Sequence, residues 1–337
     1  MLDQMLQAFA IQPYYDLAAM TPGQDLSALT ARVLDGVRRA LVDFGPDVLI
    51  VQGDTTTAMA ASLAGFYHQV PVAHVEAGLR TGDLSAPWPE EGNRRIVTAI
   101  ASWHFAPTPA AYDNLLREGI SAERIEITGN TVIDALLQTN ARIGSEEGLA
   151  TRFGAEFSFL DPAKRLILVT GHRRENLGDG LENVCLALAD LVAAHHDVEV
   201  LFPVHLNPHV KEAVMRLLGG KPRIHLVPPQ DYLRFVYLLG RCFLVLTDSG
   251  GIQEEAPSLG KPVLVSRDVT ERPEAVEAGT ARVVGANRNR IVAEVERLLG
   301  DPAAYRQMMA TRNPYGDGQA ARRIVHRLVL DGRASSR

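Results

Sequence analysis

The sequence predicts an α/β protein built from two consecutive doubly wound domains. With 337 residues, the chain exceeds the roughly 250–300 residues over which one hydrophobic core grows, so two domains are expected. Short apolar runs rich in β-branched residues alternate with amphipathic segments, a pattern typical of parallel βαβ units whose sheets are covered on both faces. The alternation weakens between residues 140 and 164, where we place the junction between the domains.

Residues 1–150 are assigned to the N-terminal domain. It opens with a helical segment over residues 2–9, and its first convincing strand comes only at residues 48–51. A doubly wound domain normally begins with a strand and a phosphate-facing turn, so either this domain is built differently or its first βαβ piece is absent. Further strands are predicted at 70–73 and 125–128, and helices at 26–44 and 110–118.

Residues 160–315 are assigned to the C-terminal domain, and residues 316–330 to a final helix. Apolar runs followed by amphipathic segments predict a second parallel sheet with helices on its faces. The predicted strands cover residues 166–170, 198–204, 224–227, 243–247 and 262–265. The predicted helices cover residues 181–195, 208–218, 232–239 and 291–299.

Composition argues against several classes of function. The chain holds 34 Lys and Arg against 40 Asp and Glu, a net charge of −6, which argues against a general nucleic-acid binder. No apolar run reaches the length of a membrane span, and the N-terminus lacks the features of a signal peptide, so a cytoplasmic protein is expected. Cys185 and Cys242 lie in apolar stretches and fit buried thiols in a reducing compartment.

Common cofactor motifs are missing from the sequence as well. It holds neither a P-loop nor an HExxH motif, and a near match to a dinucleotide fingerprint at residues 316–321 follows no strand. His172 and His205 follow different strands without an evident third ligand. We therefore expect neither a metal nor a nicotinamide cofactor.

Three acidic positions of the N-terminal domain are candidates for acid–base chemistry. Asp54 follows the strand at 48–51, and Glu76 follows the next strand. Taken alone, Asp54 could be a helix N-cap, Glu76 could pair with Arg80, and Glu90 could offset the dipole of the helix that it begins. If the three carboxylates converge on one cleft, crowding of like charge raises a pKa and makes a general base plausible.

The C-terminal domain offers groups that suit an anion. His172 and the two arginines after it lie at a strand-to-helix turn, where backbone amides and the helix dipole add to the attraction. At residues 249–251, a serine can cap a helix and two glycines allow close approach of a ligand to the backbone. Glu255 is placed to accept two ribose hydroxyls. Arg272 adds a further cation, although alone it could be a surface charge.

These stretches closely resemble the non-hydrolysing UDP-N-acetylglucosamine 2-epimerases. The resemblance runs in order from about residue 1 to residue 330. The matching motifs are residues 53–57, 74–81, 87–94, 171–176, 204–208, 247–260 and 270–279. It implies the glycosyltransferase-B architecture of two Rossmann-like domains with an interdomain cleft and a last helix that returns to the first domain. It also implies interconversion of UDP-GlcNAc and UDP-ManNAc without metal or nicotinamide cofactor, in a homodimer that serves cell-envelope polysaccharide synthesis. Some bacterial members use UDP-GlcNAc as an allosteric activator.

The resemblance also implies roles for single residues. Asp54, Glu76 and Glu90 match the catalytic carboxylates of the family, and His172 matches its essential histidine. Arg94 and His205 match family positions near the cleft, which implies that they contact the substrate. The implied uridine-diphosphate contacts are Gln230, Phe235, Ser249, Gly250, Gly251, Glu255 and Arg272. The opening strand of the family and its Gly-Thr-Arg-Pro-Glu turn, which supplies an Arg and a Lys to the nucleotide sugar, have no counterpart in this sequence.

The chemistry of such a reaction follows from the substrate. The hydrogen on sugar C2 is not acidic, but it becomes so as the bond between C1 and UDP stretches. The expected first step is elimination of UDP to 2-acetamidoglucal with a carboxylate as base, followed by addition of UDP with proton delivery to the opposite face. The alternatives are a hydrolysing epimerase that releases ManNAc and UDP, a retaining glycosyltransferase, and a truncated protein that binds UDP-sugars without turnover.

Overall fold

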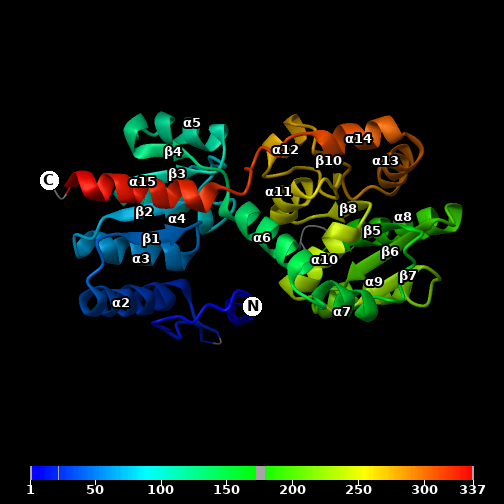
Figure 1. The fold of residues 1–337 in the computed structure, drawn as a ribbon, viewed down its shortest axis with the longest axis horizontal. Helices are drawn as coiled ribbons and strands as arrows, with labels where there is room; N and C mark the ends of the chain where they lie inside the picture. Colours follow the sequence, from blue (N-terminus) through cyan, green and yellow to red (C-terminus); the bar gives the residue numbers. More distant parts are fainter. Residues whose placement is uncertain (1, 22, 172–178, 336–337) are drawn as a thin grey trace. The chain divides into compact units, whose positions relative to one another are not determined.

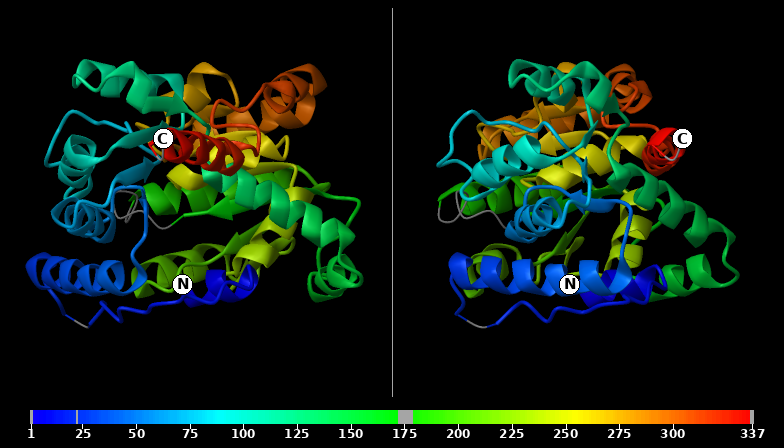
Figure 2. Two further views of the ribbon diagram at one scale, coloured as in Figure 1. Left: turned by 60° about the vertical axis from the view of Figure 1, so that its left-hand side comes forward. Right: turned by 90° about the vertical axis from the view of Figure 1, so that its left-hand side faces the viewer.

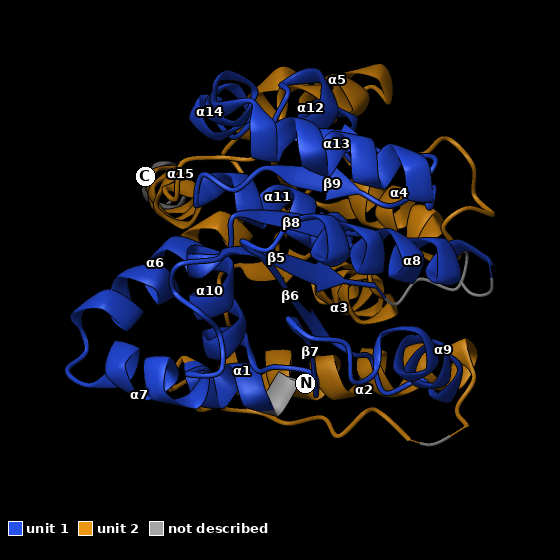
Figure 3. Cartoon of the chain, turned by 90° about the vertical axis from the view of Figure 1, so that its right-hand side faces the viewer, with its two compact units in different colours: residues 1–8, 135–314 blue, residues 9–134, 315–337 orange. Residues whose placement is uncertain are grey.

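The computed structural model describes residues 2–21, 23–171 and 179–335 (Figure 1). The chain forms two compact units (Figure 3). Unit 1 holds Met1–Ala8 and Ala135–Pro314, and unit 2 holds Phe9–Asp134 and Tyr315–Arg337. The chain leaves unit 2 within helix α6 (Thr131–Ser145) and returns to it after Pro314. The units thus divide inside one helix, whereas the sequence places the domain boundaries at residues 150 and 160.

Unit 2 contains a parallel sheet with the order β1-β2-β3-β4 among the described residues. Its strands are β1 (Leu49–Gln52), β2 (Val72–Val75), β3 (Trp103–Ala106) and β4 (Ile125–Ile127). Every residue of β2 is buried, as a parallel strand covered on both faces requires. The register pairs Gln52 with Val75. The residues that follow β1 and β2 therefore emerge side by side at the carboxyl edge of the sheet.

Helices cover the sheet of unit 2. Helix α2 (Leu26–Phe44), dark blue in Figure 2, is preceded by the N-cap residue Asp25, whose side chain accepts from the N–H of Ala28. It packs on α3 (Thr56–Tyr67). Helix α3 is rich in alanine and contributes to cores shared with α2 and with the strands. The C-terminal helix α15 (Ala320–Ser335) packs against β2 and β3. The remaining helices of this unit are α4 (Glu90–Ile100), α5 (Pro109–Arg117) and the short 3-10 helix η1 (Ala122–Arg124).

Unit 1 contains a longer parallel sheet, ordered β10-β9-β8-β5-β6-β7 among the described residues. Its strands are β5 (Arg165–Thr170), β6 (Val198–Pro203), β7 (Ile224–Val227), β8 (Leu244–Thr247), β9 (Val263–Val265) and β10 (Ala281–Val283). The chain runs outward from β5 to β7 and then returns to place β8 beside β5. This reversal is the switch point at which doubly wound sheets bind ligands, outside the carboxyl ends of the strands.

The helices of unit 1 complete the doubly wound pattern that the sequence predicts. A large core joins the sheet to α8, α9 and α13. The helices are α1 (Leu2–Ala8), α7 (Leu149–Glu156), α8 (Asp179–Ala194), α9 (Pro208–Leu218), α10 (Tyr232–Arg241), α11 (Gly250–Ser258), α12 (Pro273–Glu277), α13 (Arg288–Gly300) and α14 (Pro302–Ala310), with most of α6. Of the described helices, none combines the length and apolar composition needed to cross a membrane.

Candidate functional site

The carboxyl ends of β1 and β2 bring two of the predicted carboxylates together in unit 2. Gly53 turns the chain after β1 with a φ of +73°, and a Cβ at this position would lie 3.6 Å from Oε2 of Glu76. Glu76 itself has a φ of +63°, a left-handed conformation that costs a non-glycine residue on the order of 1 kcal/mol. The amide of Asn130 donates to Oε1 of Glu76 at 3.4 Å. The strained backbone thus aims the Glu76 carboxylate toward the turn that carries Asp54.

Asp54 is held by an arginine. The expectation that it could be a helix N-cap is wrong, because Thr55 caps α3 by accepting from the N–H of Ala58. Instead, Nε and Nη2 of Arg94 donate to Oδ2 of Asp54 at 3.0 and 2.7 Å. Asn93 also donates to the backbone oxygen of Asp54 at 2.9 Å. Helix α4 therefore grips both the backbone and the side chain of Asp54.

The start of α4 carries Glu90 and a second acid. Glu90, the third predicted carboxylate, is partly exposed at the first position of the helix. Glu91 is fully buried, and its carboxylate accepts from Arg94 at 3.1 Å and from the backbone N–H groups of Thr81 and Gly82. Burial raises the pKa of Glu91, but these donors more than offset it, so the pKa lies below its usual range. The sequence singles out Glu90 at this helix start and misses these contacts of Glu91.

A buried histidine contacts the turn at Gly53, which follows β1. His74 in β2 is 0% exposed, and its Nε2 lies 2.9 Å from the backbone oxygen of Gly53. Burial lowers the pKa of His74 to about 4, so the ring is neutral at physiological pH and donates through Nε2. Arg80, which the sequence offers as a partner for Glu76, pairs with Glu118 through Nε and Oε1 at 2.7 Å.

The switch point of unit 1 carries the predicted anion-binding groups. Ser249 lies at the N-cap position of α11, although the described residues include no capping bond from its side chain. A Cβ on Gly250 would lie 3.8 Å from the guanidinium of Arg272, so this arginine lies against the start of α11. Arg272 is mostly buried and bonded to Glu254; the alternative of a surface charge is therefore wrong. His172 lies outside the described residues.

Glu255 lies on the same helix and is almost completely buried. The hydroxyl of Tyr232 donates to its Oε2 at 3.1 Å. Burial raises the pKa of Glu255 to about 7; the Tyr232 hydroxyl lowers it and the charge of Glu254 raises it further. Burial and the neighbouring Glu255 charge also raise the pKa of Tyr232. The sequence identifies Glu255 but not Tyr232, which begins α10.

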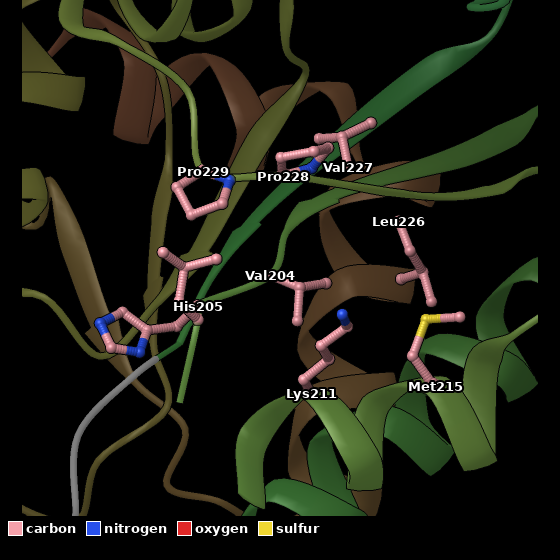
Figure 4. A pocket seen from close by; sticks show the side chains of 9 residues that line it. Val204, His205, Lys211, Met215, Leu226, Val227, Pro228 and Pro229 are labelled. Atoms are coloured by element: carbon pink, nitrogen blue, oxygen red, sulfur yellow. The ribbon is translucent and has the colours of Figure 1, made fainter. Parts of the chain in front are cut away.

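The remaining predicted residues of unit 1 lie near the ends of β6 and β7. The amide of Gln230 donates to the backbone oxygen of Pro228 at 2.6 Å, and Phe235 is partly buried in the first turns of α10. His205 is exposed and accepts from the N–H of Asn207. It lies at one edge of a pocket of about 230 Å³ between α9 and the 226–229 segment, into which Lys211 extends (Figure 4). The lining of this pocket is mainly apolar.

Two groups of predicted residues therefore assemble, one in each unit. Unit 2 gathers Asp54, Glu76 and Arg94, with Glu90 on the helix that carries Arg94. Unit 1 gathers Arg272 and Glu255 about the start of α11, with Ser249, Gly250 and Gly251 on the helix itself. Within the described part of the chain, no group of three or more His, Cys, Asp or Glu side chains could hold a metal ion.

Fold and comparison agree on the class of protein. The two parallel sheets with their helices form two Rossmann-like units of the glycosyltransferase-B type. A family model described as UDP-N-acetylglucosamine 2-epimerase matches residues 1–329. This chain belongs to the UDP-N-acetylglucosamine 2-epimerase family.

Individual relatives cover almost the whole chain. Proteins named UDP-N-acetylglucosamine 2-epimerase from Yersinia pestis and Escherichia coli K12 are 57% and 56% identical to it over 328 residues, which is 97% of this chain and 87% of theirs. A crystal structure of UDP-GlcNAc 2-epimerase from Neisseria meningitidis, bound to UDP-GlcNAc, is similar with a TM-score of 0.90 and 46% identity. That match covers 98% of this chain and 88% of the solved one.

Proposed function

We propose that this chain interconverts UDP-GlcNAc and UDP-ManNAc by epimerisation at sugar C2 without hydrolysis. The observation that carries the proposal is the pair of carboxylates Asp54 and Glu76 at adjacent strand ends, with Asp54 fixed by Arg94. The names of relatives more than half identical to the chain support the same activity. A relative that carries UDP-GlcNAc supports the choice of nucleotide sugar.

We assign the proton transfers to unit 2. A base alone cannot remove the C2 hydrogen at a useful rate, because no carbonyl is attached to C2. As the C1–O bond breaks, the bonding pair leaves with UDP, C1 becomes electron-poor, and a carboxylate takes the C2 proton to give 2-acetamidoglucal and UDP. Return of UDP to C1 with a proton delivered to the other face of C2 gives the epimer. Asp54, Glu76 and Glu90 supply the acid and base groups that two faces require.

We assign the leaving group to unit 1. The N-terminal amides of α11 beside Gly250 and Gly251 suit the diphosphate, whose developing charge Arg272 and His172 stabilise. Glu255 accepts the ribose hydroxyls, and Gln230 and Phe235 contact the uridine. We assign His205 to the same ligand, because it follows β6 at the same edge of the sheet.

Product analysis tests the proposal. The purified chain is incubated with UDP-GlcNAc, and the products are followed by NMR. We expect UDP-ManNAc to accumulate to an equilibrium mixture, with no free sugar. Formation of ManNAc and UDP would contradict the proposal and support the hydrolysing alternative. Unchanged UDP-GlcNAc would also contradict it and would support a protein that binds UDP-sugars without turnover.

We also propose that the protein acts as a cytoplasmic homodimer that serves polysaccharide synthesis, with UDP-GlcNAc as an allosteric activator. The two buried, unpaired cysteines Cys185 and Cys242 fit a reducing compartment. Light scattering measures the oligomer. The activation is measured with UDP-ManNAc as the substrate. We expect a lag in its conversion, and we expect added UDP-GlcNAc to abolish that lag.

A further inference from the structure

Glu91 is a fully buried carboxylate at the base of the candidate site in unit 2. It accepts four hydrogen bonds: from Arg94, from Arg95, and from the backbone N–H groups of Thr81 and Gly82. These donors come from the loop after β2 and from α4. Glu91 therefore fixes the start of α4, where Glu90 lies, to the chain that follows Glu76.

Arg94 connects this buried acid to Asp54. Its Nη1 donates to Glu91, while Nε and Nη2 donate to Asp54. Both of the latter bonds end on Oδ2 of Asp54, so neither of them uses Oδ1. The Asp54 side chain keeps 29% of its surface exposed, whereas that of Arg94 keeps 10%. The arginine thus pairs with two carboxylates of the protein, and the Asp54 side chain remains accessible to a ligand.

Stability alone gives little reason for this arrangement. Burying an ionised carboxylate and a guanidinium removes both from water at a large desolvation cost, and the mutual attraction of a buried pair seldom exceeds that cost. Apolar side chains of similar volume would pack there at no such cost. Two charge-assisted hydrogen bonds from one guanidinium do, however, restrict the position of a carboxylate oxygen more strictly than a single bond does.

We propose that Glu91 and Arg94 are positioning residues for the epimerisation: Glu91 holds Arg94, and Arg94 fixes the Asp54 carboxylate so that Oδ1 faces the sugar. The proposal rests on the proposed function and deepens it, because it names residues that act on the reaction through Asp54. It also replaces the sequence-based assignment of Arg94 as a substrate contact. A displacement of about 1 Å at a reacting group can cost about a hundredfold in rate.

A double-mutant cycle tests the proposal. Glu91→Gln keeps the size of the side chain but removes the charge that holds Arg94. We expect it to lower kcat about tenfold to a hundredfold while KM for UDP-GlcNAc changes by less than about twofold, since the diphosphate contacts lie in unit 1. In an Asp54→Asn background the same substitution should cause no further loss, because the carboxylate that it positions is gone. Equal losses in both backgrounds, or an unchanged kcat in Glu91→Gln, would overturn the proposal.

Two further variants separate positioning from folding. Glu118→Gln is the matched control, because it breaks the Arg80–Glu118 pair of the same unit, and in the described part of the chain the hydrogen bonds of Arg80 run to Glu118, Leu79 and Thr98 rather than to Asp54. We expect its kcat to stay that of the unmodified chain. Arg94→Lys keeps the cation but not the two bonds to Asp54, and should reproduce the loss in kcat if Glu91→Gln does not fold. A loss of turnover in Glu118→Gln as large as in Glu91→Gln would show a structural role and overturn the proposal. An unmodified chain without turnover would overturn the proposed function as well.

Discussion

The contact between Tyr232 and Glu255 allows a quantitative prediction for nucleotide binding. Glu255 can accept two ribose hydroxyls only as a carboxylate, and burial raises its pKa to about 7. The Tyr232 hydroxyl, 3.1 Å from Oε2, stabilises the charged form. A hydrogen bond to a charged group contributes about 1.5–3 kcal/mol, which corresponds to roughly one to two pKa units. Tyr232→Phe should therefore move the pKa of Glu255 from about 7 to roughly 8–9.

The consequence is a shift in the pH dependence of binding. At about pH 7.5 the ionised fraction of Glu255 falls roughly threefold for a shift of one unit and roughly 25-fold for two, and affinity falls with it. Isothermal titration of UDP-GlcNAc between about pH 6 and 8.5 measures the midpoint, because the diphosphate diester keeps its charge over this range. Glu255→Gln should bind weakly with no midpoint near 7. An unshifted midpoint in Tyr232→Phe would refute the reasoning.

Three further predictions concern unit 2. Asp54→Asn should lower kcat by about 10²–10⁴ through loss of an acid–base group, measured by steady-state turnover of UDP-GlcNAc. Gly78→Ala should cost at least about 3 kcal/mol of unfolding free energy, because the new Cβ would lie 2.2 Å from the Ala111 oxygen. Gly82→Ala, with similar φ and open space, should cost only about 1 kcal/mol of strain, and equal losses in urea unfolding would contradict this. His74 takes up its proton near pH 6.5 when unfolded but near pH 4 when folded. The contribution of His74 to the free energy of unfolding is therefore full above pH 6.5. It falls by on the order of 3 kcal/mol as the pH drops to 4, because the unfolded chain takes up the proton first. A His74→Gln variant with the same pH dependence would rule this out.

Elements with a strong hydrophobic period could be predicted from the sequence, while elements whose pattern is interrupted or weak could not. The strand at 224–227 and the helix at 208–218 match β7 and α9. Strand β3 was missed because His104 interrupts its apolar pattern, yet this histidine is buried with its Nε2 3.1 Å from the Thr98 oxygen. Helix α7 and the last six residues of α6 lie in the segment of weak periodicity. Helix α6 runs from one unit into the other, so its residues are divided between two cores.

The residues of the candidate site likewise divide into those that a local sequence pattern predicts and those that it does not. Asp54 and Glu76 follow strands, and the parallel-sheet rule alone places them at one edge. Glu91 and Tyr232 were missed because their roles depend on partners distant in sequence, which no local pattern reveals. One signal was available for Glu91: arginines three and four residues later on the same helix, a spacing at which opposite charges meet. That spacing predicts the contact with Arg94 but not the further contact with Asp54.

The most direct test of the central claim, that the reaction removes and replaces the proton on C2, uses deuterated water. UDP-GlcNAc is incubated with the protein in deuterium oxide, and C2 of the product is examined by NMR. We predict UDP-ManNAc that carries deuterium at C2, because the base loses the original proton to solvent before a new one is delivered to the opposite face. Product that forms with hydrogen retained at C2 would contradict the elimination and re-addition of UDP.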